Sequence, residues 1–77
     1  MTGKERFKEL GYKLTLSTEF SDIFERDGLA GEKNVVVFDK QSFQILLQTS
    51  IDGEEVASFL PNDVYVAIFK HSGELGW

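Results

Sequence analysis

The turn signals in the middle of the chain restrict its fold more than any other feature of the sequence. Residues 27–33 (DGLAGEK) combine two glycines with charged side chains, and residues 39–42 (DKQS) are a polar link of hairpin length. Asp52-Gly53 suits a type I′ turn, because both central residues of that turn need a positive φ. Links this short join neighbouring antiparallel strands. The sequence therefore predicts an antiparallel meander.

The segments between these links have the composition of strands. Tyr12, Leu14 and Leu16 alternate with polar residues, which predicts a strand with one buried face. The run NVVVFD is rich in β-branched residues and predicts a central strand covered on both faces. The predicted strands are residues 12–18, 21–26, 34–39, 43–49, with Phe43, Ile45 and Leu47 on one face, and 55–59.

The start of the chain has the signals of a short helix. Thr2 and Glu5 stand at capping-box spacing, so that each can bind a free backbone N–H of the first turn. Phe7 and Leu10 lie three residues apart on one helical face. Gly11 follows as a residue that can end the helix in the left-handed conformation.

The segment after Pro61 is compatible with two structures. Val64, Val66 and Ile68 alternate as in a strand, whereas Val64 and Ile68 also share one helical face. Proline favours the helix, because it fits the first helical turn and removes a ladder donor from a strand. We predict a helix over about residues 62–72, with a strand as the alternative.

The last eight residues, KHSGELGW, raise the question of what the only tryptophan does. Gly73 is expected to end the helix, because glycine in a helix interior costs about 1 kcal/mol relative to alanine. Leu75 and Trp77 can then fold back onto the core. We expect Trp77 to cover the end of the apolar layer near Phe7 or Leu10; the alternative is an exposed anchor for a partner.

These predictions describe one α+β domain over residues 1–77: an N-terminal helix, an antiparallel meander of four to five strands, and a C-terminal helix. Both helices are expected on one face of the sheet. The 77 residues include no cysteine, so apolar packing rather than disulfides must stabilise the fold. Hydrophobic residues make up 42% of the chain and seven residues are phenylalanine, a composition typical of a folded domain.

Three short motifs resemble a loose group of small uncharacterised proteins of Gram-positive bacteria, their phages and mobile elements. Members open on a helix that runs into F-x-E-L-G-Y, carry a central I-x-F-D strand and close on a helix ending in E-L-G-W. The resemblance implies a fold and a biological setting, with no established activity. The matching residues are Phe7, Glu9, Leu10, Gly11, Tyr12, Val37, Phe38, Asp39, Glu74, Leu75, Gly76 and Trp77.

The chain departs from that group at two places in the last helix. It has LPND where the group has a helix start rich in threonine and glutamate, and Ser72-Gly73 where the group has helix formers. Both departures concern the length of this helix. If the helix runs to Leu75, Gly76 becomes its stop and Gly73 lies inside it.

The residue types needed for most enzymatic chemistry are scarce. Cysteine nucleophiles are excluded, and a serine triad would need His71, the only histidine. We expect His71 to be a solvated residue favoured by the helix dipole near a C-terminus. One histidine without cysteine makes a zinc site improbable, and no phosphate-binding glycine motif is present. We therefore predict a protein that is not an enzyme and uses no cofactor or metal.

The net charge of the chain limits the classes of macromolecule that it can bind. The net charge is −5, although residues 1–13 carry +2. An acidic body opposes binding to nucleic acid and to anionic membranes. We predict an unknown protein partner or self-association as a homodimer. A module that binds nucleic acid through the basic first helix is the alternative.

The candidate interaction surface is a second sheet face, opposite the helices, together with the tryptophan. A small sheet also leaves edge strands that can pair with another chain. The start of the sequence lacks the apolar stretch of a signal peptide, so a cytoplasmic location is expected. The predicted surface residues are Phe24, Val36, Phe38, Leu46 and Trp77.

Overall fold

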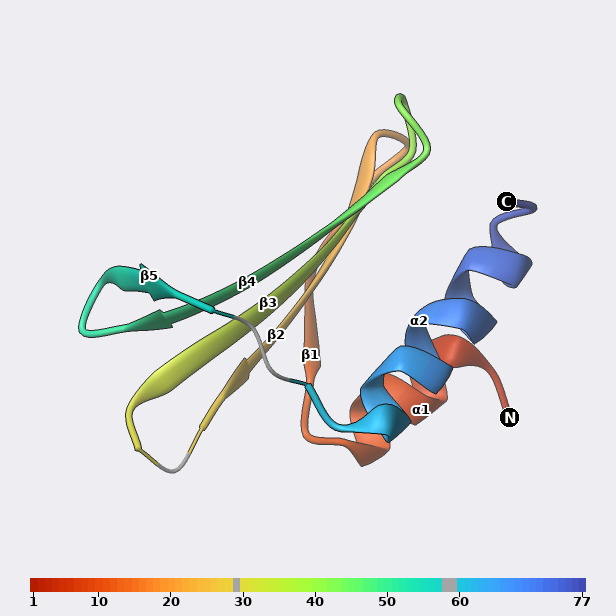
Figure 1. The fold of residues 1–77 in the computed structure, drawn as a ribbon. Helices are drawn as coiled ribbons and strands as arrows, with labels where there is room; N and C mark the ends of the chain where they lie inside the picture. The colour runs from red at the N-terminus through yellow and green to blue at the C-terminus, as the bar shows by residue number, and fades with distance from the viewer. Residues whose placement is uncertain (29, 58–59) are drawn as a thin grey trace.

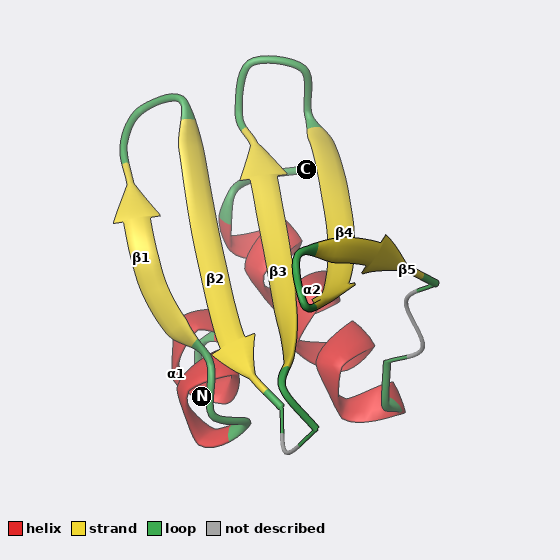
Figure 2. Ribbon diagram, turned by 90° about the vertical axis from the view of Figure 1, so that its left-hand side faces the viewer, coloured by secondary structure: helices red, strands yellow, loops and turns green. Residues whose placement is uncertain are grey.

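A computed structural model describes residues 1–28, 30–57 and 60–77. Five strands form one antiparallel sheet in the order β1-β2-β3-β4-β5, and both helices lie on the same face of it (Figures 1 and 2). The predicted α+β fold is confirmed. The elements are α1 (Gly3–Glu9), β1 (Lys13–Ser17), β2 (Ser21–Asp27), β3 (Glu32–Asp39), β4 (Gln44–Ile51), β5 (Glu54–Val56) and α2 (Asn62–Glu74).

Helix α1 begins and ends as its sequence predicts. The Thr2 hydroxyl accepts a hydrogen bond from the Glu5 amide at 3.1 Å, and the Glu5 carboxylate accepts one from the Thr2 amide at 2.9 Å. Gly11 has φ +88°, a conformation that a side chain would disfavour. Phe7 on this helix is fully buried. The capping box and the glycine stop are both confirmed.

Helix α2 confirms the helical prediction, and the strand alternative is wrong. The helix is longer than predicted, because Gly73 lies inside it and Gly76, with φ +82°, follows it. The Gly76 amide donates to the Gly73 carbonyl at 3.1 Å, and the Trp77 amide donates to the Ser72 carbonyl at 3.0 Å. This Schellman arrangement satisfies the last carbonyls and turns the chain back toward the core.

A bulge in β1 overturns the predicted alternation of that strand. Leu14 pairs with Phe24, whereas Leu16 pairs with Ile23, so the register shifts between the two leucines. A bulge adds one residue to one strand and moves the following side chain to the other face. Leu14 therefore shares the face of the helices, Leu16 lies on the opposite face, and both are substantially exposed.

The hairpins that follow agree with their turn signals in most respects. Asp52 and Gly53 have φ of 52° and 81°, as a type I′ turn requires. Phe43 has φ 57° and lies just before β4, so it does not share a strand face with Ile45 as predicted. The final strand covers residues 54–56; the predicted extension into residues 58–59 lies outside the described residues.

Three phenylalanines from α1, β2 and β3 form the centre of the core. The rings of Phe7 and Phe24 stack with centroids 4.2 Å apart, and Phe38 meets both edge-on. Val36 is buried beside them. Placing Phe24, Val36 and Phe38 on an exposed second face was therefore wrong.

The wrong set of alternate residues was assigned to the buried face. Successive residues of a strand point to opposite faces, so a shift by one residue exchanges the two sets. On the face opposite the helices, Ile23 pairs with Val37, and Val37 pairs with Leu46. Leu46 is 52% exposed and is the one strand residue of the predicted surface that lies there. A run of three valines does not itself reveal which of them face the core.

Trp77 covers the core at a different place from the one predicted. It is partly buried and packs against the core cluster. Its ring centroid lies 6.1 Å from that of Phe38 and 5.9 Å from that of Phe43. The predicted neighbours were Phe7 and Leu10, but the longer helix carries the tryptophan to the β3–β4 end of the sheet.

Two glycine substitutions test how the helices pack. A methyl group on Gly3 would lie 2.6 Å from the His71 backbone nitrogen, whereas one on Gly73 meets no atom within 4 Å. We expect Gly3→Ala to lower the free energy of unfolding by about 1–3 kcal/mol through overpacking. Gly73→Ala should raise it by about 0.5–1 kcal/mol, because alanine favours the helix interior.

Urea denaturation of both variants beside the unchanged protein measures these effects. A Gly3→Ala variant as stable as the unchanged protein would contradict the close contact between α1 and α2.

Candidate functional site

A buried hydrogen bond joins α2 to the sheet. His71 is only 2% exposed, and its Nε2 lies 2.8 Å from Oδ2 of the buried Asp22 on β2. The prediction of a solvated histidine is therefore wrong. The sequence contained a signal for burial, since His71 follows Val64 by seven residues and so lies on the same helical face as Val64 and Ile68.

The carboxylate of Asp22 is fully engaged. Its Oδ1 accepts a hydrogen bond from the Ser17 hydroxyl at 2.7 Å and lies 3.0 Å from Lys40 Nζ. Burial alone raises the pKa of Asp22, but the hydrogen bonds from Ser17, His71 and Lys40 outweigh it and hold the pKa below its ordinary value. Lys40 Nζ also donates to the Thr18 carbonyl at 2.8 Å.

The same cluster extends to the first helix. Both carboxylate oxygens of Glu74 accept a hydrogen bond from the Gly3 amide, at 2.9 and 3.0 Å. One of them lies 3.6 Å from His71 Nδ1. The cluster thus connects the two helices with the β1–β2 and β3–β4 turns.

The geometry of this cluster differs from that of a serine triad. In a triad the histidine contacts the nucleophile and the carboxylate contacts the far side of the histidine. Here Asp22 lies between Ser17 and His71 and binds both. An arrangement of this kind holds the helix on the sheet through the shared carboxylate.

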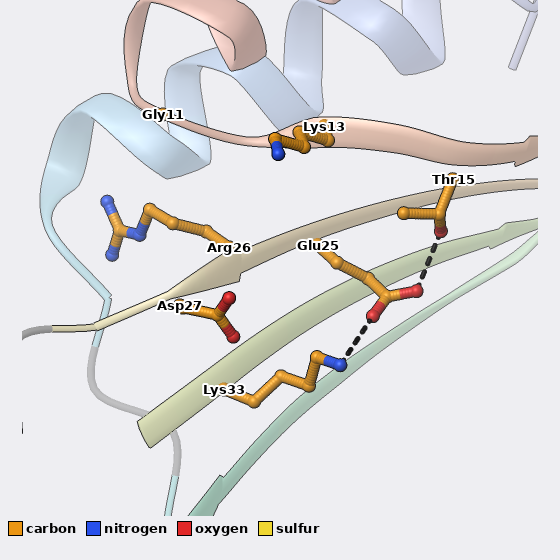
Figure 3. Close-up of a pocket in the computed structure, with 7 residues that line it drawn as sticks. All are labelled: Gly11, Lys13, Thr15, Glu25, Arg26, Asp27 and Lys33. Atoms are coloured by element: carbon orange, nitrogen blue, oxygen red, sulfur yellow. Dashed lines mark hydrogen bonds and ion pairs between the residues drawn. The ribbon is translucent and has the colours of Figure 1, made fainter. Parts of the chain in front are cut away.

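A polar hollow of about 350 Å³ lies at the opposite end of β1–β3 (Figure 3). The Glu25 carboxylate, which lines it, accepts a hydrogen bond from the Thr15 hydroxyl at 2.7 Å and pairs with Lys33 at 3.2 Å. The nearby Arg26 guanidinium donates to the Leu10 carbonyl at 3.2 Å. Residues 1–28, 30–57 and 60–77 contain no group of three or more histidine, cysteine, aspartate or glutamate residues that could hold a metal ion.

Three of the four basic residues of the N-terminal region lie around one hollow in the fold. Lys4, Lys8 and Lys13 line one shallow hollow together with Leu14 and Phe24. Arg6 does not line this hollow. Within the described part of the chain, neither helix is long and apolar enough to cross a membrane.

An apolar groove of about 490 Å³ lies between β4 and α2, and we refer to it as the β4–α2 groove. No charged side chain is among the described residues that line it. Phe69 projects from α2 with 79% of its surface exposed. The main lining residues are Ile45 and Leu47 from β4, Tyr65, Ile68 and Phe69 from α2, and the terminal Trp77.

Among the residues that the structure describes, none pairs with the edge of β4 beside this groove. Strand β5 pairs only with Thr49, Ser50 and Ile51, so no strand of the described chain pairs with that edge over residues 44–48. Sequence reasoning found Trp77 but missed the groove. A signal existed, because Tyr65 and Phe69 are four residues apart on α2 and lie beside the buried face rather than on it.

Comparison of the chain with models of protein families, with curated proteins and with solved structures finds no match. The resemblance to small proteins of Gram-positive bacteria and their phages therefore stays a prediction.

The buried Asp22 predicts a specific loss of stability in acid. Its pKa in the folded chain is below the value of about 3.9 expected when unfolded, so its contribution is present above pH ~4 and disappears as the pH falls through the folded value. Asp22→Asn should lower the free energy of unfolding at neutral pH by about 1–3 kcal/mol, because Ser17, His71 and Lys40 lose an ionised partner. The loss of stability as the pH falls below about 4 should shrink in this variant.

Urea denaturation at several pH values measures both effects, with Asp27→Asn, an exposed carboxylate, as the control. Identical acid profiles for Asp22→Asn and the unchanged protein would contradict the role of this carboxylate.

Proposed function

We propose that this chain is a small accessory protein that acts by binding another protein chain in the β4–α2 groove, rather than by catalysis. The observation that carries the proposal is the combination of an uncharged apolar groove with an open strand edge beside it. The phage or mobile-element setting, which rests on the sequence resemblance, and the cytoplasmic location expected from the sequence belong to the same proposal.

The groove supplies the two components used in recognition by strand addition. In this mode an extended segment binds the backbone of an open strand edge, and pockets beside the edge accept alternate side chains. Residues 44–48 of β4 offer the edge. Ile45, Leu47 and Phe69 offer an apolar surface next to it, so a partner would gain both backbone hydrogen bonds and apolar burial.

The charge distribution favours a protein over nucleic acid at this place. The groove has no charged lining residue, whereas a phosphate backbone requires lysine or arginine. The nucleic-acid alternative rests on a different observation, the gathering of Lys4, Lys8 and Lys13 around one hollow. A gel shift at low salt that weakens steeply with added salt would favour it, and no shift at low salt would remove it.

Selection from a displayed library of random peptides tests the proposed function. The protein is attached sparsely to a surface through one biotin so that copies stay apart. We expect enrichment of peptides with alternating apolar residues, because an extended strand presents every second side chain to the groove. Phe69→Asp should lose these peptides, since a carboxylate in the groove would be desolvated without a partner.

Phe20→Asp is the matched control, because Phe20 is also exposed but lies in the β1–β2 turn away from the groove. This variant should retain the selected peptides. Failure of the unchanged protein to select any peptide, together with failure to self-associate, would contradict the proposal.

A further inference from the structure

We infer that the partner in the β4–α2 groove is a second copy of this chain, bound through antiparallel pairing of the two β4 strands about a two-fold axis at Leu46. This inference rests on the proposed function, because it names the occupant of the same groove.

The open segment of β4 is complementary to itself. Residues 44–48 have the sequence Gln-Ile-Leu-Leu-Gln, which is nearly the same in both directions about Leu46. In an antiparallel pair centred there, Gln44 faces Gln48 and Ile45 faces Leu47 of the other copy. No charged side chain opposes another of like sign. A two-fold interface requires this kind of self-complementarity.

The backbone N–H and C=O groups that this pairing needs point toward the open edge of β4. Ile51 and Glu54 close the two-residue turn, so the backbone groups of Ile51 are directed toward β5. Alternate residues of an antiparallel strand direct their backbone groups to the same edge. The groups of Ile45 and Leu47 therefore face the open edge, and pairing Ile45 with Leu47 of the second copy forms the hydrogen-bonded pairs of a regular ladder.

The same pairing brings the exposed apolar side chains together. Ile45 and Leu47 lie on the face of the helices, since they pair with Phe38 and Val36 of the core. The two grooves then adjoin along the seam, and Phe69 from each α2 has an apolar surface to contact. On the other face, Leu46 meets its own counterpart at the axis.

Three exposed aromatic side chains supply about half of the area that a standard interface buries. Phe69, Phe43 and Tyr65 are 79%, 71% and 39% exposed. At about 200 Å² for each aromatic side chain, they provide roughly 400 Å². A standard interface buries about 800 Å² per partner, so these three side chains supply about half and Ile45, Leu46 and the strand edge add to it.

The other edge of the sheet is poorly suited to pairing. Strand β1 contains the bulge between Leu14 and Leu16 and begins with Lys13, and both features protect an edge from addition of a strand. A pair of β4 strands closes on itself, because both copies pair through the same segment, residues 44–48. The inference therefore specifies a dimer and not a filament.

Introducing a charge at Leu46 tests the position of the axis. We expect sedimentation velocity between about 1 and 200 µM to show a concentration-dependent dimer of the unchanged protein. Leu46→Lys and Leu46→Glu should each weaken dimerisation about tenfold or more, since two like charges meet at the axis. An equimolar mixture of the two variants should form a heterodimer, because the charges are then opposite.

Leu16→Lys is the matched control, since Leu16 is 44% exposed on the same sheet face but lies on β1. It should dimerise like the unchanged protein. Hydrogen exchange adds a local measurement: the amides of Ile45 and Leu47 should be protected in the dimer and exchange fast in Leu46→Lys.

Each other outcome has a definite meaning. A chain that is monomeric at about 200 µM but selects peptides would overturn the inference and leave the proposed function standing. A monomer that selects none would overturn both. A dimer unaffected by either Leu46 variant, or a mixture that does not restore dimerisation, would place the interface elsewhere and overturn the inference.

Discussion

The contact between His71 and Asp22 determines how the helical layer sits on the sheet. A buried carboxylate is costly unless its oxygens are hydrogen-bonded, and both oxygens of Asp22 have partners. Those partners come from α2, from the end of β1 and from the β3–β4 turn. The contact therefore fixes the direction of α2 across the strands, which apolar packing alone, being non-directional, would specify less strictly.

Apolar packing then makes the two faces of the sheet different. The phenylalanines of α1, β2 and β3 stack on the side of the helices, with Trp77 closing the β3–β4 end. The opposite face keeps smaller aliphatic side chains that remain partly exposed. In a chain of this size the helices can cover only one face of the sheet. The second face and the edges therefore stay exposed to water unless a partner buries them.

The position of α2 also creates the β4–α2 groove. The helix rests against the core through Val64, Ala67 and Ile68, so its next face, with Tyr65 and Phe69, projects past the edge of β4. Strand β5 is too short to cover that edge. The same packing that buries the core therefore leaves an uncharged apolar surface beside unpaired backbone groups, a combination typical of a surface that binds another chain.

Local sequence determined the elements of this protein, because their signals act over a few residues. The capping box of Thr2 and Glu5, the Asp52-Gly53 turn and the choice of helix after Pro61 follow from backbone geometry that neighbouring residues impose. Only the tertiary structure decided which strand face is buried, that Gly73 lies within a helix, that His71 reaches Asp22 across the fold, and that a groove opens beside β4. A shift of one residue exchanges the two faces of a strand. A contact between distant segments depends on how the elements pack together rather than on local spacing.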